Sequence, residues 1–516
     1  MHIYFKGRPE LLGIICYHLK MELPFEFQLP LLGVVLVTLG SLYVAARYLN
    51  VNSGKNLPPG SLGFPFFGES IGLLRSMKKN NKEWFESRIR KYGPVFKTSL
   101  MGAQFAILTS QAGTKFVLTA NDGIANNQSA SASAIFGRKS LLDAEGSRHK
   151  LLKGAVMNML KPERLQKFIG EMDIIVKKQL LQELKHKDSV NFVTLIRKVV
   201  FMVNCTILFR IPEGGMDKYA LRMEDLVAAF RATWAIPLNI PGTVFGKGCK
   251  ARARICKVLC NLVKTRKKEL VEEDEKERDS EYDVITCFLN VRDDEGLPLS
   301  EEDIVDNLMT LLLASHDTTA SLLSLFVHYI GRDSHVYNKV LEEQKEVARA
   351  RANSTDVGKL TWSEIQSMKY TWRVAQEIMR LTPPVGGTTR RTTKDISFGG
   401  FNIPKGWHLL WMAFSTHMDA EIFEDPEKFD PSRFEKSPSK PVPPPYTYLP
   451  FGAGSRICPG SELARVETLL IIHHLIIYYQ WTPMITNEPI VNDPVPYPAM
   501  GLPAKLHSRA DLDKNT

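Results

Sequence analysis

One stretch near the C-terminus decides the fold, Phe451-Gly-Ala-Gly454-Ser-Arg456-Ile-Cys458-Pro-Gly460. Gly454 and Gly460 can adopt backbone angles that other residues avoid, which lets the loop fold closely around Cys458 before the next helix begins. Nearly every residue here has a role if Cys458 is a thiolate ligand of haem iron, because that sulfur must be deprotonated, shielded from water and supported by N–H donors. In that arrangement Arg456, two residues before the cysteine, reaches a haem propionate.

The same cysteine has two alternative explanations. One is a buried structural cysteine in a glycine-rich turn. The other is a zinc ligand, which is disfavoured because no second cysteine lies within a few residues of Cys458 and neither His473 nor His474 forms a finger-like spacing with it.

The spacing Phe-x-x-Gly-x-Arg-x-Cys-x-Gly resembles the haem-binding loop of the cytochrome P450 monooxygenases. A chance match is disfavoured, since glycine makes up ~7% of residues in average proteins and cysteine is much rarer. The resemblance implies haem b as the cofactor, with an axial thiolate from Cys458. The positions that it implies around the cofactor are Phe451, Gly454, Arg456 and Gly460.

An apolar helical stretch, Leu308 to Ile330, is interrupted by Ala314-Ser-His-Asp317-Thr318-Thr319. Burying unpaired polar groups is costly, so a carboxylate beside a hydroxyl here needs a reason. In the haem-thiolate monooxygenases this helix crosses the distal face of the porphyrin, and the resemblance implies that Asp317 and Thr318 deliver protons to dioxygen. The alternative is a structural hydroxyl bonded to a carbonyl one turn earlier, beside an aspartate placed like an N-cap. Ser315 stands where the family usually has glycine. This difference puts in question how efficiently electron use is coupled to product formation, more than it does the resemblance to the family.

A second pair of motifs is charged. Glu377-Ile-Met-Arg380 places an acid and a guanidinium three residues apart on one helix face, where they can pair. Downstream, Pro431-Ser-Arg433-Phe434 supplies a further arginine. Together Glu377, Arg380 and Arg433 resemble the Glu-Arg-Arg triad of the family, a buried ion network behind the haem loop. Taken separately, each motif is equally typical of a surface pair.

Haem carries two carboxylates, so cationic side chains are expected beside them. The resemblance implies Arg390 as well as Arg456 at the propionates. It also implies His149 and Lys153, which lie four residues apart on a predicted helix. Lys153 stands where relatives typically have an arginine, and it keeps the positive charge without the bidentate geometry of a guanidinium.

Composition limits the class of protein. The chain has 516 residues and a net charge of +10, which is not concentrated enough to indicate nucleic-acid binding. Its densest basic run, 247–268, is either a solvated helix face or a basic surface near anionic lipid or an acidic redox partner. The seven cysteines are odd in number and show no paired spacing, which indicates reduced thiols in a cytosol-facing protein.

An uncharged, mostly apolar stretch, Leu29 to Ala46, is long enough to cross a bilayer as one helix. Arg47 and Lys55 follow it and indicate the cytosolic side. Basic residues upstream of the stretch make the difference in positive charge between its two ends less clear, unless translation begins at Met21 and leaves them out. A cleaved signal peptide is the alternative, disfavoured by the length of the stretch and by the oxidising lumen that it implies for a haem thiolate. We expect a single-pass protein of the endoplasmic reticulum membrane whose catalytic domain faces the cytosol.

The chain is predicted to divide into a tail (1–28), a transmembrane anchor (29–49), a Pro/Gly-rich hinge (50–65) and a haem-thiolate catalytic domain (66–516). Apolar residues at three- and four-residue spacing predict helices over 163–184, 219–234, 251–273 and 301–329. Short strands are predicted at 95–100, 105–108, 396–398 and 409–412. The expected fold is mainly α with a small β part, the cytochrome P450 fold, with haem between helices and one N-terminal transmembrane helix.

Segments outside these motifs, such as Ile403-Pro-Lys-Gly-Trp407, resemble a plant branch of the family that oxidises terpenoids and steroids, including triterpenoid oxidases and taxane hydroxylases. The same resemblance places substrate-facing side chains in segments rich in apolar residues, which suit a bulky apolar molecule. The substrate-facing residues expected are Ser129, Val385, Thr388 and Tyr497. The alternative is that these are ordinary core positions.

The predicted function is that of a monooxygenase that oxidises a lipophilic terpenoid or steroid with dioxygen. The chain has no flavin or nicotinamide fingerprint, so electrons are expected from an NADPH-cytochrome reductase. One alternative is a haem-thiolate isomerase or dehydratase that needs no dioxygen, but such relatives commonly lose the acid-alcohol pair. The other is a catalytically silent haem- or lipid-binding protein.

Overall fold

The computed structural model describes residues 33–35, 37–42, 56–64, 67–78, 82–211, 215, 219–272, 283–352, 359–435 and 442–509. The predicted tail and the alternative start at Met21 lie outside these residues, and the predicted anchor and hinge lie only partly inside them. Within the anchor, 33–35 and 37–42 are helical, and Val34, Val37 and Leu42 expose their side chains.

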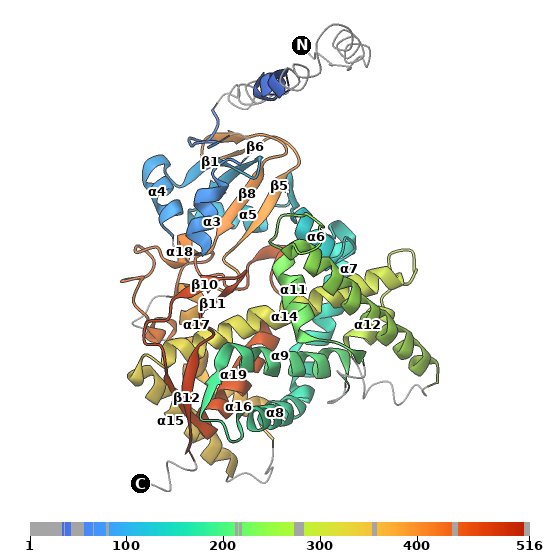
Figure 1. Ribbon diagram of the computed structural model, residues 1–516, viewed down its shortest axis with the longest axis vertical. Coiled ribbons are helices and arrows are strands. Elements are labelled where there is room, and N and C mark those ends of the chain that lie inside the picture. Colours follow the sequence, from blue (N-terminus) through green and yellow to red (C-terminus); the bar gives the residue numbers. More distant parts are fainter. Residues whose placement is uncertain are drawn as a thin grey trace.

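Helices dominate the described chain (Figure 1). In order they are α3 (Ser70–Lys78), α4 (Glu83–Tyr92), α5 (Gln111–Thr119), α6 (Ala130–Phe136), α7 (Gly146–Leu160), α8 (Pro162–Leu184), α9 (Phe192–Phe209), α11 (Met223–Ala232), α12 (Val244–Glu272), α13 (Val284–Leu289), α14 (Glu301–Ile330), α15 (Ser334–Ala352), α16 (Trp362–Ser367), α17 (Lys369–Leu381), α18 (Phe414–His417) and α19 (Ser461–Tyr478). Two short 3₁₀ turns are η1 (Pro431–Phe434) and η2 (Gly454–Arg456).

The larger sheet has the strand order β1-β2-β8-β5-β3, and it lies on the side of the molecule nearest the N-terminal segment in Figure 1. Its strands are β1 (Val95–Leu100), β2 (Ala103–Leu108), β3 (Ile124–Asn126), β5 (Gly387–Thr392) and β8 (His408–Met412). Strands β2 and β8 are parallel, and the other neighbours are antiparallel.

Three smaller sheets complete the β part, with the orders β4-β12-β9, β10-β11 and β6-β7. Their strands are β4 (Ser189–Asn191), β6 (Ile396–Phe398), β7 (Phe401–Ile403), β9 (Tyr479–Pro483), β10 (Ile490–Asn492), β11 (Pro496–Pro498) and β12 (Pro503–Ser508). The mainly α fold with a small β part is therefore confirmed, and the four predicted helices and four predicted strands all form, with most ends shifted by a few residues and the start of α12 by seven.

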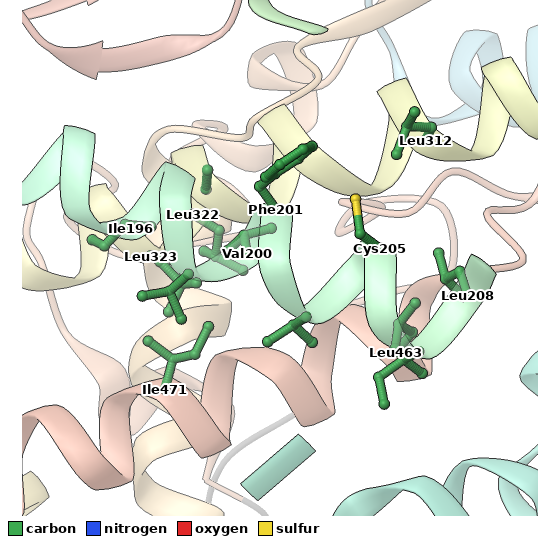
Figure 2. Close-up of a cluster of buried hydrophobic side chains, with 14 of the residues drawn as sticks. Ile196, Val200, Phe201, Cys205, Leu208, Leu312, Leu322, Leu323, Leu463 and Ile471 are labelled. Atoms are coloured by element: carbon green, nitrogen blue, oxygen red, sulfur yellow. The ribbon is translucent and has the colours of Figure 1, made fainter. Parts of the chain in front are cut away.

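Helix α14 is the centre of the fold. Its start is fixed by a capping box in which Ser300 accepts from the Asp303 N–H and the Asp303 carboxylate accepts from the Ser300 N–H. The helix is apolar on nearly all sides, and such a helix is normally buried. It packs against α9, α12, α17 and α19. Figure 2 shows part of this core, where side chains of α9, α14 and α19 meet, among them Phe201, Cys205, Leu312, Leu323, Leu463 and Ile471.

Two described helices, α9 and α14, are long and apolar enough to cross a membrane by length and composition alone. In both, 78% of the most apolar window is buried inside the protein, so these are core helices.

Helix α19, which begins just after Cys458, is tied down by buried polar contacts. The Asp173 carboxylate on α8 lies 2.6 Å from His474 Nε2 and 3.4 Å from the Arg351 guanidinium. Because all these side chains are largely buried, the pairing is needed to offset the desolvation of the charges. The C-terminal half of α19 is thereby held against α8 and α15.

Candidate haem site

The loop before α19 folds back on itself around Cys458. The Cys458 N–H donates to the Phe451 carbonyl over 2.9 Å. Gly454 has a φ of +68°, and a Cβ there would meet the Leu118 carbonyl oxygen at 2.5 Å, so only glycine fits. The expectation that Gly460 needs a backbone angle closed to other residues was wrong, because its φ of −94° suits any residue and an added Cβ would make an ordinary contact of 3.9 Å with the Cys458 sulfur.

The Cys458 side chain is accessible on one side, although protein surrounds much of the sulfur. This desolvation raises the pKa of the thiol, while a hydrogen bond from the Gly460 N–H and the charge of Lys153 act in the opposite direction. A coordinated thiol loses its proton outright. The N–H donor and the nearby cation therefore fit a sulfur that becomes a thiolate when it binds a metal.

Three cations and a histidine gather near this loop from three parts of the chain. His149 and Lys153 lie on α7, Arg390 on β5 and Arg456 on η2. Lys153 donates to the Ser455 carbonyl over 2.7 Å, and Arg456 donates to the carbonyls of Leu141 and Ala144. Arg390 donates to the Thr388 hydroxyl and to Asn126.

Within the described chain, none of Lys153, Arg390 and Arg456 forms an ion pair with a carboxylate. Burial and the charge of Arg456 lower the pKa of Arg390 to about 10. Burial, together with the charges of Arg456, Lys153 and Arg390, lowers the pKa of His149 to about 4. An anion offsets both the desolvation and the mutual repulsion of these groups, so the cluster fits the two haem propionates.

Helix α14 turns one side toward accessible space. Ala314 is exposed and Thr318, one turn later, is partly exposed, although most of the helix is buried. The Thr318 hydroxyl donates to the Ala314 carbonyl over 2.7 Å, which is the back-bonded geometry that a structural hydroxyl adopts. A small residue and a hydroxyl on the open side suit a flat ligand lying against the helix.

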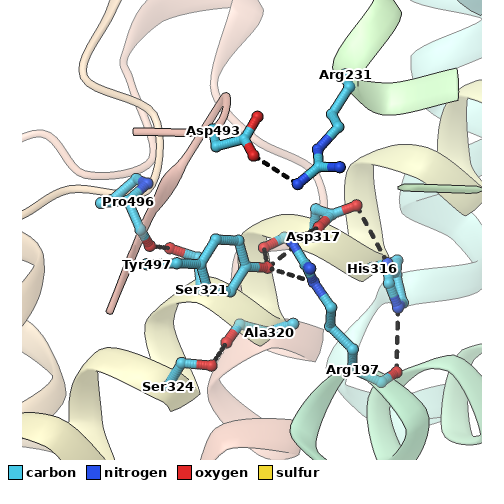
Figure 3. A network of polar contacts seen from close by, with 10 residues as sticks. All are labelled: Arg197, Arg231, His316, Asp317, Ala320, Ser321, Ser324, Asp493, Pro496 and Tyr497. Atoms are coloured by element: carbon cyan, nitrogen blue, oxygen red, sulfur yellow. Dashed lines mark hydrogen bonds and ion pairs between the residues drawn. The ribbon is translucent and has the colours of Figure 1, made fainter. Parts of the chain in front are cut away.

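The Asp317 side chain is buried on another side of α14, where it meets α9 and β11 (Figure 3). Its Oδ1 accepts from Arg197 Nη2 and from the Tyr497 hydroxyl, each over 3.1 Å. Its Oδ2 lies 3.3 Å from His316 Nδ1. Burial alone would raise the pKa of Asp317, but His316, Arg197 and Tyr497 together lower it.

The Glu-Arg-Arg network forms as expected, and it is not a surface pair. Glu377 and Arg380 are fully buried and make a two-point contact, with both N···O distances 2.8 Å. Arg433 Nε lies 3.4 Å from Glu377 Oε1, which also accepts from the Asp430 N–H. Such a network fixes the segment before the cysteine loop, because removing one partner would leave a buried charge unpaired.

Comparisons with known proteins agree with this geometry. Residues 58–507 match the family model of cytochrome P450. This chain belongs to the cytochrome P450 family. It is 34% identical to the taxane 10-beta-hydroxylase of Taxus cuspidata over 93% of this chain and 94% of that protein. It is 35% identical to the beta-amyrin 28-monooxygenase of Vitis vinifera over 94% of this chain and 98% of that protein.

A solved structure shows the same fold. The retinoic acid-bound cyanobacterial CYP120A1 superposes with a TM-score of 0.77 and 30% sequence identity, covering 88% of this chain and all of that one. The protein is therefore a cytochrome P450 monooxygenase whose haem iron is held by a cysteine thiolate. Enzymes of this family use dioxygen, a redox partner and a lipophilic substrate.

The expected substrate-facing residues of this P450 have different surroundings. Tyr497 was placed wrongly, since its side chain is buried and its hydroxyl is bonded to Asp317. Ser129 caps α6 and donates to the Thr233 carbonyl, and Thr388 accepts from Arg390. Val385 exposes 47% of its surface, so it remains the best candidate for an apolar contact.

A buried acid of the P450 on α19 was not predicted from the sequence. Glu467 is buried among apolar side chains, and neither of its carboxyl oxygens has a hydrogen-bond partner in the described residues. Burial raises its pKa to about 8, although the nearby Thr319 hydroxyl acts in the opposite direction. The signal in the sequence was a lone carboxylate in the apolar run from Leu463 to Ile477.

Glu467 gives a prediction about stability and pH. The unfolded chain loses this proton near the ordinary pKa of 4.5, whereas the folded protein keeps it up to about 8. The unfolded state binds fewer protons in that window, so this group lowers stability as the pH rises. We expect the melting temperature of Glu467→Gln, relative to wild type, to increase between about pH 5 and about pH 8. Glu462→Gln, on a partly exposed turn of α19, is the control, and an equal trend in both variants would contradict the prediction.

Proposed function

We propose that this cytochrome P450 oxidises a bulky lipophilic terpenoid or steroid, with Cys458 as the thiolate ligand. The observation that carries the proposal is the cluster of Lys153, Arg390 and Arg456, which lies beside the cysteine loop and forms no ion pair with a carboxylate among the described residues. Three cations placed together, with Arg390 buried and the other two half-buried, are stabilised when an anion joins them. In this arrangement Arg390 and Arg456 bind the propionates, and Lys153 adds charge near the sulfur.

When bound, haem supplies the reductive activation of dioxygen, and thiolate ligation favours O–O bond cleavage. Residues of the chain support the thiolate and fix the loop that carries it. Gly460 donates its N–H to the sulfur, and Gly454 permits the close approach of the loop to Leu118. The Glu377–Arg380 pair holds the preceding segment in place.

Thr318 and Asp317 are proposed to move protons toward the open side of α14. The Thr318 hydroxyl lies on that side, next to the exposed Ala314. Asp317 is the acid that resupplies it, and its partner Arg197 lines an open surface pocket of about 320 Å³ between α9 and α11. Solvent in this pocket is the proposed source of protons for the carboxylate.

The substrate class is proposed from the relatives and from the apolar character of the predicted lining. The taxane and beta-amyrin in the relatives' names are a diterpenoid and a triterpenoid skeleton. Val385, with its exposed apolar side chain, and the Thr388 hydroxyl suit a large apolar molecule that carries few polar groups. An isomerase or dehydratase is not favoured, because both Asp317 and Thr318 are present.

The redox partner and the location are also proposals. We infer an NADPH-cytochrome reductase as the electron donor and a single-pass anchor in the endoplasmic reticulum membrane. Apolar side chains of the helical segment 33–42 are exposed. A second exposed apolar stretch follows α11 and suits the membrane interface. It comprises Trp234, Ile236, Leu238, Ile240 and Val244.

The ligand assignment predicts a spectroscopic signature. The reduced, carbon monoxide-bound protein should show the strongly red-shifted Soret band of thiolate-ligated haem, and Cys458→Ala should abolish it. Cys287→Ala, which removes a thiol on α13, is the control and should keep the band. A wild-type band typical of histidine-ligated haem would refute the assignment.

The acid-alcohol pair predicts an uncoupling phenotype. Products are first identified after co-expression with a reductase and triterpene, diterpene and sterol scaffolds. Thr318→Ala should then keep haem content but divert electrons to hydrogen peroxide, because protons no longer reach dioxygen in time. Asp317→Asn should slow turnover by roughly 10²–10⁴-fold, the usual effect of a general acid or base. Unchanged product and peroxide yields per nicotinamide in both variants would show that the pair is structural.

The anchor predicts the outcome of two truncations. Deleting residues 1–28 should leave membrane association intact, because Leu29 to Ala46 supplies an apolar span. Deleting 1–46 should weaken association without abolishing it, since the exposed Trp234–Val244 stretch still binds the interface. Sedimentation with microsomal membranes measures both, and loss of binding in the shorter deletion would mean that the span is misplaced.

A further inference from the structure

Glu467 on α19 is a buried acid that the proposed chemistry does not use. Only 1% of its surface is exposed. Leu463 and Ile471, one helical turn before and after it, belong to the apolar cluster in which α9, α14 and α19 meet (Figure 2). Because burial raises the pKa of Glu467 to about 8, the carboxyl keeps its proton at neutral pH and has one O–H to donate.

The charged groups around α19 leave this acid alone. Among the described residues, only burial and the Thr319 hydroxyl shift the pKa of Glu467. The buried titratable groups on α19 and on the helices packed against it have partners of their own, apart from His328 on α14, whose pKa burial lowers to about 4. The partnered groups are His316 and Asp317 on α14, Asp173 on α8, Arg351 on α15, Glu377 and Arg380 on α17, and His473 and His474 on α19.

Thr319 is the polar group within reach of this acid. It is buried on α14, directly after Thr318 in the chain and one turn before Leu323 of the same apolar cluster. The carboxyl oxygens of Glu467 have no partner of full hydrogen-bond geometry in the described residues, but the Thr319 hydroxyl is close enough to act on them. A buried O–H without an acceptor is costly, so a small rotation that brings it onto the Thr319 oxygen is favourable.

This contact joins the two helices that carry the proposed chemistry. Helix α19 begins three residues after Cys458, and α14 presents the Thr318 hydroxyl on its open side. Apolar packing between the two helices is non-directional, whereas an O–H···O contact depends on distance and angle. A polar contact at Thr319 therefore restricts how far α14 can rotate or slide against α19, and the neighbouring Thr318 moves with it.

We propose that Glu467 is a positioning residue, whose neutral carboxyl bonds to Thr319 and thereby fixes Thr318 relative to the cysteine-bearing end of α19. This inference rests on the proposed proton-transfer role of Thr318. The ionised carboxylate would lie in an apolar interface without a counter-charge, which is unfavourable unless water enters. Ionisation therefore loosens α14 from α19, and the positioning is lost.

The test compares Glu467→Leu with Glu467→Gln in the full-length enzyme with its reductase. Leucine fills the site without a polar group, so product per nicotinamide should fall about fivefold, the effect of one neutral hydrogen bond. Haem content and the carbon monoxide spectrum should stay unchanged, and the melting temperature should equal or exceed that of wild type, because a buried polar group is removed. Glutamine keeps a neutral donor and should retain most of the coupling. Wild-type coupling in the leucine variant, or equal losses in both variants, would overturn the proposal.

Three further variants separate positioning from a general effect on α19. Thr319→Val removes the proposed acceptor and should reproduce the loss seen in Glu467→Leu. Thr468→Val is the matched control, because that buried hydroxyl donates to the Ala464 carbonyl of its own helix over 2.7 Å, and coupling should be unchanged. In a Thr318→Ala background, Glu467→Leu should add nothing, since its action passes through that hydroxyl. An equal loss in Thr468→Val would assign the effect to α19 as a whole and refute the positioning role.

The pH profile gives an independent measurement. The neutral acid is present below its raised pKa of about 8 and is lost as the pH rises through that value. Product per nicotinamide in wild type, divided by that in Glu467→Gln, should therefore decrease as the pH rises through about 8. Parallel profiles of the two proteins would contradict the proposal.

The outcome also distinguishes this inference from the proposed function. If Thr318→Ala itself leaves coupling unchanged, the proton-transfer role of that hydroxyl is wrong and the inference falls with it. If Thr318→Ala uncouples the enzyme but Glu467→Leu does not, the proposed function stands and only the role of Glu467 is refuted.

Discussion

The structure depends on positive charge that no ion pair within the described residues neutralises. Lys153, Arg390 and Arg456 come from a helix, a strand and a loop far apart in sequence, and they are brought together near Cys458 without an ion pair to a described carboxylate. Burial, together with repulsion among these cations, lowers the pKa values of Arg390 and His149. A fold that concentrates cations in this way is stable only when the rest of the molecule holds them, and the cofactor's carboxylates then add to that stability.

Buried ion pairs elsewhere in the molecule hold the cysteine loop and the helix that follows it in place. Glu377 and Arg380 satisfy each other behind the loop, and Asp173 binds His474 to fix α19. Burying an ion pair stabilises a protein little, but breaking one is strongly destabilising. These pairs therefore specify one arrangement of the cysteine loop more than they contribute net stability.

Sequence patterns predicted the features that depend on neighbouring residues or on a strict spacing of residue types. The helical periodicity of 301–329 gave α14 because apolar residues recur on every turn, and the loop from Phe451 to Gly460 fixes its own geometry through Gly454. The short strands of the β10-β11 hairpin had no such pattern, since each has only three residues. The partners of Asp317 also escaped prediction, because Arg197 and Tyr497 lie 120 and 180 residues away and meet it only through the packing of α9 and β11.

The geometry of a helix explains why such partners are needed. Neighbouring residues on an α-helix point about 100° apart, since one turn takes about 3.6 residues. Thr318 faces the accessible side of α14, so the adjacent Asp317 must face elsewhere, and here it faces the core. A carboxylate in the core requires donors, which Arg197, Tyr497 and His316 provide. The same donors oppose its movement toward Thr318, so the strength of their combined hold, and not the presence of the acid alone, determines how readily a proton can cross from one side of the helix to the other.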